Sequence, residues 1–489
     1  AAAPLLVVLW GLIAEGLHHF EAPGRPEEGD FWSPERRSLL NQAVRGPVPV
    51  AKRKGPLKTL NTLNECTLAA GNRSCPLASL RRGESTSLRP QGMTRCILGD
   101  PFSFQVVPGA PDKLLLWFDG GGACWDQDGA TGIIPTCQRT VVVTPIMGPY
   151  NNCPEGKVSN PFKDYTVIFI PSCSGDLHSG NRTMDWKVPD RNGTVAYRGY
   201  YNTQAVIEWA LTNLPDVADL VVGGVSAGAI GVQIWSHKIL SLFRYRRAKV
   251  VLDAYADVFP DGLTEALMIK YGACDTDLTW GPFRDMCTGG RLNLPTLLDG
   301  VIEAFPSVQF ASLQSRYDAT QSMYYDLTNS FQHRNAIKQF CLGKSDCDLS
   351  SAPKDLQVNT VPIKAGEYRN RSEQHLRRWA ERPNYHFYQT DSNNHAVTPF
   401  IFGNCQPLLN YEQFLPGFSR PRRDAIARLL ASFLAGGDEG TRSRCEVARG
   451  GSPCTTALGA EEFVAYSMAR TRQVPGRSLA AAVALAAAA

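Results

Sequence analysis

The sequence lacks the signals of several protein classes. Its formal net charge is only +4 over 489 residues, which is too small to indicate a nucleic acid or an anionic membrane surface as the partner. No two cysteines form a C-x-x-C pair, so a zinc ribbon or thioredoxin-like site is not expected. No internal repeat is present. The apolar runs near the two ends, residues 4–14 and 478–489, are too short to span a bilayer.

The chain does have fourteen cysteines, scattered singly along its length. An even number of scattered cysteines fits structural disulfides and an oxidising compartment, although their pairing does not follow from the sequence. We interpret residues 4–14 as the apolar region of a signal peptide whose start is missing, and the alternative is a wrongly assigned start. N-x-S/T sequons agree with secretion and stand at Asn72, Asn181, Asn192 and Asn370.

Amino-acid composition divides the chain into three parts. Residues 1–60 combine the expected signal segment with a leader rich in Pro, Gly and charge, residues 61–440 have globular composition, and residues 441–489 form a C-terminal extension. In the middle part, apolar runs alternate with stretches of helical spacing, which predicts an α/β fold with a mostly parallel central sheet flanked by helices. The expected strands are 113–118, 165–171, 220–223, 249–254, 307–313 and 385–388, and the expected helices are 200–214, 227–242 and 421–435.

Two further expectations concern packing. In the expected helix 200–214, helical spacing assigns the core positions Ala205, Ile207, Trp209, Ala210 and Leu214. The stretch Ile269–Thr296 interrupts the alternation of strands and helices and carries two of the cysteines. We expect it to be a lid or cap insertion.

The sharpest local signal is the motif G-V-S-A-G at residues 224–228. It has the form G-x-S-x-G, follows an expected strand and opens an expected helix, as the nucleophile elbow of α/β-hydrolases does. So tight a turn needs small residues around Ser226, and the Ala227 N–H at the helix N-terminus can face a developing oxyanion. We therefore expect Ser226 to be a nucleophile. The alternative is an ordinary strand–helix turn that needs small residues.

A serine nucleophile needs a base, and in this fold the chain order is serine, acid, histidine. Four histidines follow Ser226 outside its own helix. His333 and His375 stand among charged residues in expected helices and are interpreted as exposed, and His386 falls inside an expected strand. His395 lies in a polar loop directly after that strand, where the base of this fold belongs.

The acid must lie between the serine and the histidine. Asp318 follows a late expected strand, so it has the right order and the right place. Asp253 and Asp257 follow the expected strand 249–254, and Asp391 precedes His395. All three stay open as alternatives to Asp318.

A glycine-rich loop, D-G-G-G-A-C at residues 119–124, follows an early expected strand. Glycines let the backbone approach a tetrahedral intermediate and leave N–H groups unobstructed, so this loop is the expected second oxyanion donor. The alternative is a turn with no role, since no Lys-Ser/Thr follows the glycines to make a phosphate loop. Asp176 and His178 have no third ligand nearby, and no metal is expected.

Four segments together resemble the pectin acetylesterase/Notum family of extracellular carboxylesterases. They are residues 115–125, 160–180, 198–206 running on to 224–228, and 317–321. The sequence departs from the family's frequent pattern at Val225, where a cysteine is common, and at Ala229, where a second glycine is common.

The resemblance implies an α/β-hydrolase-like fold without an organic cofactor or a catalytic metal, and a protein that is secreted and disulfide-bonded. It also implies functional roles for six residues. These are a triad of Ser226, Asp318 and His395, and oxyanion donors at Gly121, Gly122 and Ala227.

We therefore expect a secreted serine carboxylic ester hydrolase that removes O-acetyl groups from polysaccharide. Its partner would be an O-acylated substrate, most simply a carbohydrate, with no nucleic acid, no strong membrane association and a monomeric state. One alternative is a Notum-type deacylase that removes an O-acyl lipid from a protein. The other is a catalytically dead α/β-hydrolase that serves as a binding module, although every candidate triad position is filled.

Overall fold

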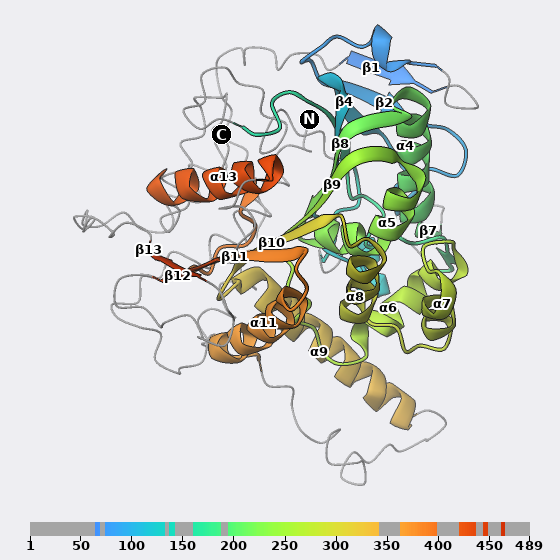
Figure 1. Ribbon diagram of the computed structural model, residues 1–489. Coiled ribbons are helices and arrows are strands. Elements are labelled where there is room, and N and C mark those ends of the chain that lie inside the picture. The colour runs from blue at the N-terminus through green and yellow to red at the C-terminus, as the bar shows by residue number, and fades with distance from the viewer. Residues whose placement is uncertain are drawn as a thin grey trace, which may run out of the picture.

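A single large sheet organises the part of the chain that the computed structural model describes. The described residues are 64–68, 74–132, 136–141, 160–186, 194–341, 362–398, 420–436, 444–447 and 461–464. The sheet has eleven strands in the order β1-β2-β3-β5-β4-β8-β9-β10-β11-β12-β13 (Figure 1). Every neighbouring pair from β5 onward is parallel, whereas β3 is antiparallel to both β2 and β5. The expected mostly parallel sheet is confirmed.

The strands of this sheet are β1 (Asn64–Thr67), β2 (Thr86–Arg89), β3 (Phe104–Val107), β4 (Ala110–Phe118), β5 (Tyr165–Ile170), β8 (Asp216–Val225), β9 (Arg244–Asp253), β10 (Gln309–Ser315), β11 (Tyr385–Thr390), β12 (Arg444–Val447) and β13 (Glu461–Val464). A small separate hairpin pairs β6 (Thr183–Met184) with β7 (Val195–Ala196). The helices are α3 (Gln127–Thr131), α4 (Gly199–Asn213), α5 (Ala227–Leu242), α6 (Leu263–Tyr271), α7 (Gly281–Thr288), α8 (Leu294–Ala304), α9 (Ala319–Cys341), α11 (Ala365–Ala380) and α13 (Arg420–Ala435), with short 3₁₀ turns η1 (Leu77–Ser79) and η3 (Ala273–Asp275).

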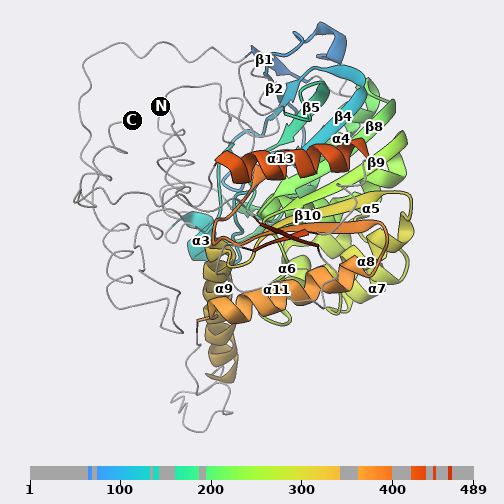
Figure 2. The same ribbon diagram turned by 60° about the vertical axis from the view of Figure 1, so that its left-hand side comes forward.

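Alternate residues of the central strands face two different helical layers. Leu116 of β4 and Val222 of β8 belong to the core that includes α4 and α5, whereas their neighbours Leu115 and Val221 belong to the core that includes α13. Side chains alternate between the two faces of a strand, so strands that are buried on both sides are apolar throughout. Figure 2 shows α13 lying across one face of the sheet with α5 behind it.

The core of α4 differs from the expected set at one position. Ile207, Trp209, Ala210 and Leu214 are buried as expected, but Ala205 is only half-buried. The buried face of this helix runs through residues 202–203, 206–207 and 209–210, a repeat of three to four residues that leaves position 205 at its edge.

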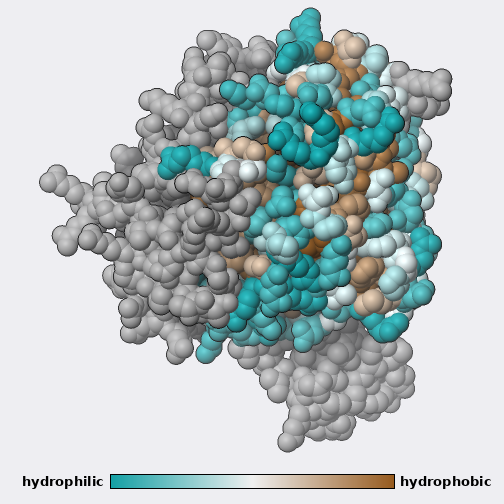
Figure 3. Space-filling view, in the orientation of Figure 1, coloured by the Kyte–Doolittle hydropathy of each residue, from teal (hydrophilic) through white to brown (hydrophobic). Residues whose placement is uncertain are grey.

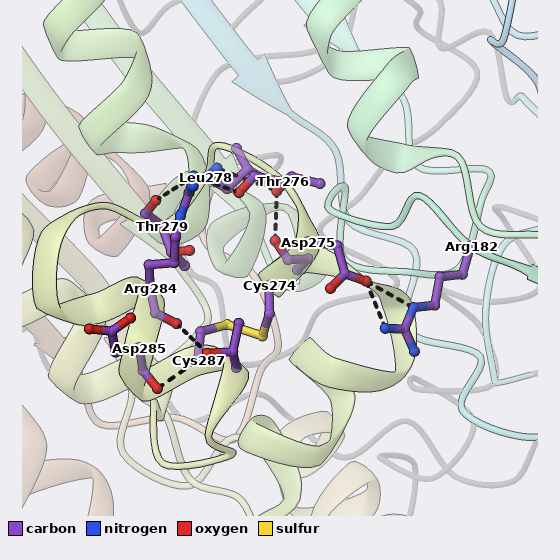
Figure 4. Close-up of a disulfide and its surroundings, with 11 residues drawn as sticks. Arg182, Cys274, Asp275, Thr276, Leu278, Thr279, Arg284, Asp285 and Cys287 are labelled. Carbon is purple, nitrogen blue, oxygen red and sulfur yellow. Dashed lines mark hydrogen bonds and ion pairs between the residues drawn. A yellow bond between two sulfur atoms is a disulfide. The ribbon is translucent and has the colours of Figure 1, made fainter.

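The stretch Ile269–Thr296 packs as a compact group of short helices. It spans the end of α6, η3, α7 and the start of α8, and the Cys274–Cys287 disulfide joins η3 to α7 (Figure 4). An ion pair between Arg182 and Asp275, 2.7 Å long, attaches η3 to the loop after β5. The role of this stretch as a lid or cap remains a prediction.

The structure confirms that the chain forms disulfides. The described residues contain four of them, Cys66–Cys75, Cys96–Cys173, Cys124–Cys137 and Cys274–Cys287. The expected signal segment, the leader, the sequons at Asn72 and Asn192 and the chain end at 478–489 lie outside the described residues. The boundaries at residues 60 and 440 therefore remain predictions.

The surface of the described residues is mostly polar. Their exposed large apolar side chains are Met93, Leu242 and Ile269, and the face in Figure 3 is largely hydrophilic, with apolar residues in small separate spots. None of the helices described above has the length and apolarity needed to cross a membrane.

Candidate active site

Ser226 occupies a strained turn between β8 and α5. Its backbone angles are φ 55° and ψ −125°, a combination that residues other than glycine seldom adopt and that costs roughly 1–3 kcal/mol. The Ser226 N–H donates to the carbonyl oxygen of Asp253 on the neighbouring strand β9, at 2.8 Å. A strained serine at a sharp strand-to-helix turn is the geometry of a nucleophile elbow.

The glycines of the G-x-S-x-G motif are required by close backbone packing. A Cβ atom on Gly224 would collide with the main chain of Gly228, the second residue of α5. A Cβ atom on Gly228 would collide with the carbonyl oxygens of Phe118 and Asp119, where β4 ends. The start of α5 therefore lies directly against the end of β4, and only glycine allows that approach.

The glycine-rich loop after β4 lies against Ser226. A Cβ atom on Gly120 would be 3.1 Å from the Ser226 Cβ and 3.8 Å from its Oγ. The loop is fixed by a main-chain hydrogen bond from Gln138 N–H to the Gly121 carbonyl at 2.7 Å and by the Cys124–Cys137 disulfide. The loop therefore has a defined shape beside the serine.

Some main-chain N–H groups of the glycine-rich loop and of the start of α5 donate hydrogen bonds within the protein, and others do not. Ala123 N–H donates to Thr136 and Cys124 N–H donates to Gly175. In the described part of the chain, the N–H groups of Gly121, Gly122 and Ala227 donate no hydrogen bond. The role of these three groups as oxyanion donors remains a prediction, in which Ala227 would add the partial positive charge of a helix N-terminus.

The structure brings together Asp318, which follows β10, and His395, which follows the neighbouring strand β11. The His395 Nδ1 lies 3.0 Å from Asp318 Oδ1 and 2.9 Å from Oδ2. Asp318 is fully buried after β10, and the His395 side chain is 17% exposed after β11. A carboxylate only accepts, so Nδ1 carries the proton of this hydrogen bond and Nε2 remains free to accept one.

Charges around His395 favour its protonated form. Burial works to lower the pKa of His395, but the charge and hydrogen bond of Asp318, together with the charge of Asp253, outweigh burial. The net result is a pKa above the usual 6.5. A histidine whose pKa is raised in this way is well suited to receive a proton near neutral pH.

The other candidate carboxylates have different partners. Asp253 accepts hydrogen bonds from Val397 and Thr398 in the loop that carries His395. Asp391 forms an ion pair with the buried Arg316, at 3.8 Å. Asp257 is buried, and burial raises its pKa to about 7. Asp318 is the carboxylate that the structure places against the His395 ring.

Two of the other three candidate histidines are held in structural contacts. His386 lies in β11 as expected, with Nε2 2.9 Å from Gln309 Oε1. His375 is half-buried and stacks on Trp379 rather than being exposed, and burial, aided by Arg378 and Arg371, lowers its pKa to about 4. The His333 side chain lies outside the described atoms.

The pair Asp176 and His178 is also structural. Asp176 accepts from Ser174 Oγ and Gly199 N–H, and His178 Nε2 contacts the Asp119 carbonyl at 2.9 Å. Among the described residues, no group of three or more His, Cys, Asp or Glu side chains is arranged to hold a metal ion.

One residue of the site was not singled out in the sequence. Gln321 donates its main-chain N–H to Asp318 Oδ1 at 2.9 Å and its side-chain Nε2–H to Oδ2 at 3.0 Å. Asp318 directly precedes α9, so it also caps this helix. The segment D-A-T-Q at residues 318–321 has the acceptor at the cap and the glutamine three residues later that mark a capping box, and this signal predicts the main-chain bond. It does not predict the side-chain bond, because the side chain of that glutamine would bond the backbone N–H of the cap residue.

If the expected ester hydrolysis takes place at Ser226, we expect Gly122→Ala to lower it about 100-fold by displacing the glycine-rich loop. Gly122 has φ 66°, and a Cβ atom there would collide with the Tyr324 hydroxyl and the Thr136 carbonyl. Gly262→Ala is the matched control, because its φ is 75° but no atom lies within 4 Å. Steady-state kinetics and thermal unfolding of both variants provide the measurement. Equal activity losses in the two variants would contradict this account.

Comparison with known proteins adds three findings. Residues 93–264 match the sequence model of the pectinacetylesterase family, whereas no curated protein matches the chain. One crystal form of the Wnt deacylase Notum from Drosophila is similar with a TM-score of 0.41 and 16% identity, covering 63% of this chain and 84% of Notum. A second crystal form gives 0.40 and 16%, covering 62% and 82%.

The family match and the α/β architecture define the class of this protein as a carboxylic ester hydrolase. Its substrate is accordingly an acylated molecule. The resemblance to the pectin acetylesterase/Notum family is confirmed over residues 93–264, which include the glycine-rich loop and Ser226.

Proposed function

We propose that this protein is a secreted serine esterase that removes O-acetyl groups from polysaccharide, with Ser226, His395 and Asp318 as its triad. The observation that carries the chemistry is the strained Ser226 beside a loop with unused N–H donors. The match to the pectinacetylesterase family supports acetylated carbohydrate as the substrate. The disulfides support secretion, because such bonds persist in oxidising compartments.

The proposed reaction has two half-reactions. His395 Nε2 takes the proton of Ser226 Oγ as the oxygen attacks the acyl carbon, and the carbonyl oxygen becomes an oxyanion held by the N–H groups of Gly121, Gly122 and Ala227. The C–O bond to the alcohol then breaks, and His395 returns the proton to the leaving oxygen. Water attacks the acyl-serine with His395 again as base, which releases the carboxylic acid and regenerates Ser226.

Asp318 has a separate role in this mechanism. Its buried carboxylate holds the His395 Nδ1–H, so the ring keeps the tautomer that leaves Nε2 free. Its negative charge stabilises the imidazolium that forms in each half-reaction. No metal or organic cofactor is needed for these steps.

The acyl chain length tests the proposal directly. We expect purified protein to hydrolyse p-nitrophenyl acetate at a higher kcat/KM than p-nitrophenyl octanoate or palmitate, and to release acetate from acetylated pectin. A preference for long chains would instead favour an O-acyl lipid deacylase of the Notum type. No turnover of any ester by folded protein would favour a binding module.

The pH dependence of kcat/KM supplies a second measurement. The free enzyme needs a neutral His395, and the pKa of this group is raised above 6.5. We therefore expect activity to fall on the acid side with a midpoint above pH 6.5. A midpoint below that value would contradict His395 as the base.

We also propose that the protein acts as a monomer, without nucleic acid or strong membrane association. The small net charge supports the absence of nucleic acid and of an anionic membrane as partners. The monomeric state is supported by the few large apolar side chains exposed on the described residues. Sedimentation of the purified protein near its chain mass of 53.5 kDa, apart from attached glycans, is the expected outcome, and a stable dimer would overturn it.

A further inference from the structure

Asp253 contacts both the turn that carries Ser226 and the loop that carries His395. It is the last residue of β9, in register with Val225 of β8. Its carbonyl oxygen accepts the N–H of Ser226 at 2.8 Å. The main chain of Asp253 is therefore part of the support of the strained serine turn.

The side chain of Asp253 contacts the loop that carries His395. Its carboxylate accepts the Val397 N–H, 3.0 Å from each oxygen. The Thr398 N–H and the Thr398 hydroxyl both donate to Oδ2 at 2.6 Å. These donors lie two and three residues after His395, so the carboxylate holds the base of the loop that carries the histidine.

Resting on the proposed function, we propose that Asp253 is a positioning residue that ties the His395 loop to the strand end bearing Ser226. Through its two sets of hydrogen bonds, one residue sets where the histidine ring stands relative to the serine. On the N-terminal side of His395 the loop is held by the Tyr317 N–H on the Ser392 carbonyl and the Ala319 N–H on the Asn393 carbonyl, both at 3.1 Å. The contacts of Asp253 hold the C-terminal side of the loop.

The backbone of the loop shows why such an anchor is needed. Ala396, between His395 and Val397, has φ 65°, a conformation that is strained for alanine. Strain of this kind persists only where surrounding contacts fix the chain. Hydrogen bonds from neighbouring N–H groups to a buried carboxylate are charge-assisted and therefore strong enough to fix it.

The charge of Asp253 also acts on the His395 ring. The titratable groups that face His395 are Asp318 and Asp253, and both raise its pKa. Burial raises the pKa of Asp253 to about 6, although hydrogen bonds from Thr398 and Val397 and the charge of His395 work to lower it. Removal of this carboxylate should therefore lower the pKa of His395 as well as release the loop.

Asp253→Asn is the direct test, because asparagine keeps the shape but turns an NH₂ group toward donors. We expect kcat to fall about 100-fold, as for a displaced catalytic group, with KM little changed. The acid-side midpoint of kcat/KM should move to lower pH, because one of the two charges that raise the His395 pKa is lost. A loss of stability with kcat and the midpoint unchanged would overturn the proposal.

Thr398 provides a milder pair of variants in case Asp253→Asn fails to fold. Thr398→Val removes the hydroxyl donor without changing the shape of the fully buried side chain, and we expect kcat to fall about 10-fold. Thr398→Ser keeps the donor and should restore most of this loss. Equal kcat values in the valine and serine variants would contradict the anchoring role.

Asp176→Asn is the control for loss of a buried carboxylate. Asp176 also accepts hydrogen bonds in the core, so stability should fall, but the acid-side midpoint should stay in place. Ser226→Ala distinguishes failure of the proposed function from failure of the role of Asp253. If that variant keeps full activity, the proposed function fails; if it is inactive while Asp253→Asn and Thr398→Val match the wild type, only the role of Asp253 fails.

Discussion

Ser226→Ala is expected to lower kcat for p-nitrophenyl acetate by roughly 10⁵-fold, because the triad acts as a unit and loses its function with the nucleophile. The fold should be retained, since the Ser226 N–H to Asp253 hydrogen bond is made by the main chain. Residual hydrolysis should be independent of pH through the range in which His395 titrates. Full activity in the alanine variant would show that another residue forms the acyl-enzyme.

Ser226→Gly is the matched variant that separates chemistry from strain. Alanine keeps the cost of φ 55° at this position, whereas glycine adopts positive φ freely. We expect both variants to be inactive, and we expect the glycine variant to be more stable than the alanine variant by about 1 kcal/mol. Denaturant unfolding of the pair measures this difference. Equal stabilities would mean that the turn at residue 226 is not strained.

The central elements of the fold follow from the sequence because they are buried on both faces. Apolar runs predicted β4 and β5 at close to their observed places and the middle of β8, and the expected helix 227–242 coincides with α5. Burial on both faces gives a run of apolar residues that no surface element shows. The motif at residues 224–228 is informative for the same reason, since close packing at the end of β4 admits only glycine there.

Elements stabilised by polar contacts were harder to predict. β8 and β9 begin earlier than their apolar runs, where Arg244 pairs with Asp216 and Arg247 with Asp219 across the two strands. Hydrophobic periodicity carries no signal for such pairs. The short antiparallel strands β2 and β3 were also missed, since four-residue strands are too short to show a period.

In the candidate site, some residues could be predicted from their sequence neighbours, whereas others depend on contacts between distant parts of the chain. Ser226 and the glycine-rich loop have local signatures, whereas the contact of Asp318 with His395 joins residues 77 positions apart. Order along the chain and position after a strand suggested that pair, but left Asp253 open as the acid. Only the packing of β9 against the His395 loop reveals what Asp253 contacts, because its partners lie 144 and 145 residues away.

Asp318→Asn should give the second large effect, a fall in kcat of about 10⁴-fold, because the amide can donate to Nδ1 and so stabilise the wrong tautomer of His395. The pKa of His395 should fall too, since the charge and hydrogen bond of Asp318 are what outweigh burial. The residual activity should therefore persist to lower pH than that of the wild type. An unchanged acid-side midpoint would contradict the pairing of Asp318 with His395.

Gln321→Leu tests how the orientation of the Asp318 carboxylate, apart from its charge, affects activity. Leucine removes the Nε2–H donor to Asp318 Oδ2 but leaves the main-chain donor to Oδ1, so Asp318 keeps its charge and loses part of its orientation. We expect kcat to fall about 10-fold, as for loss of one charge-assisted hydrogen bond, with the midpoint moved little. If Gln321→Leu instead shifts the midpoint as far as Asp318→Asn does, the glutamine acts on the charge of Asp318 rather than on its position.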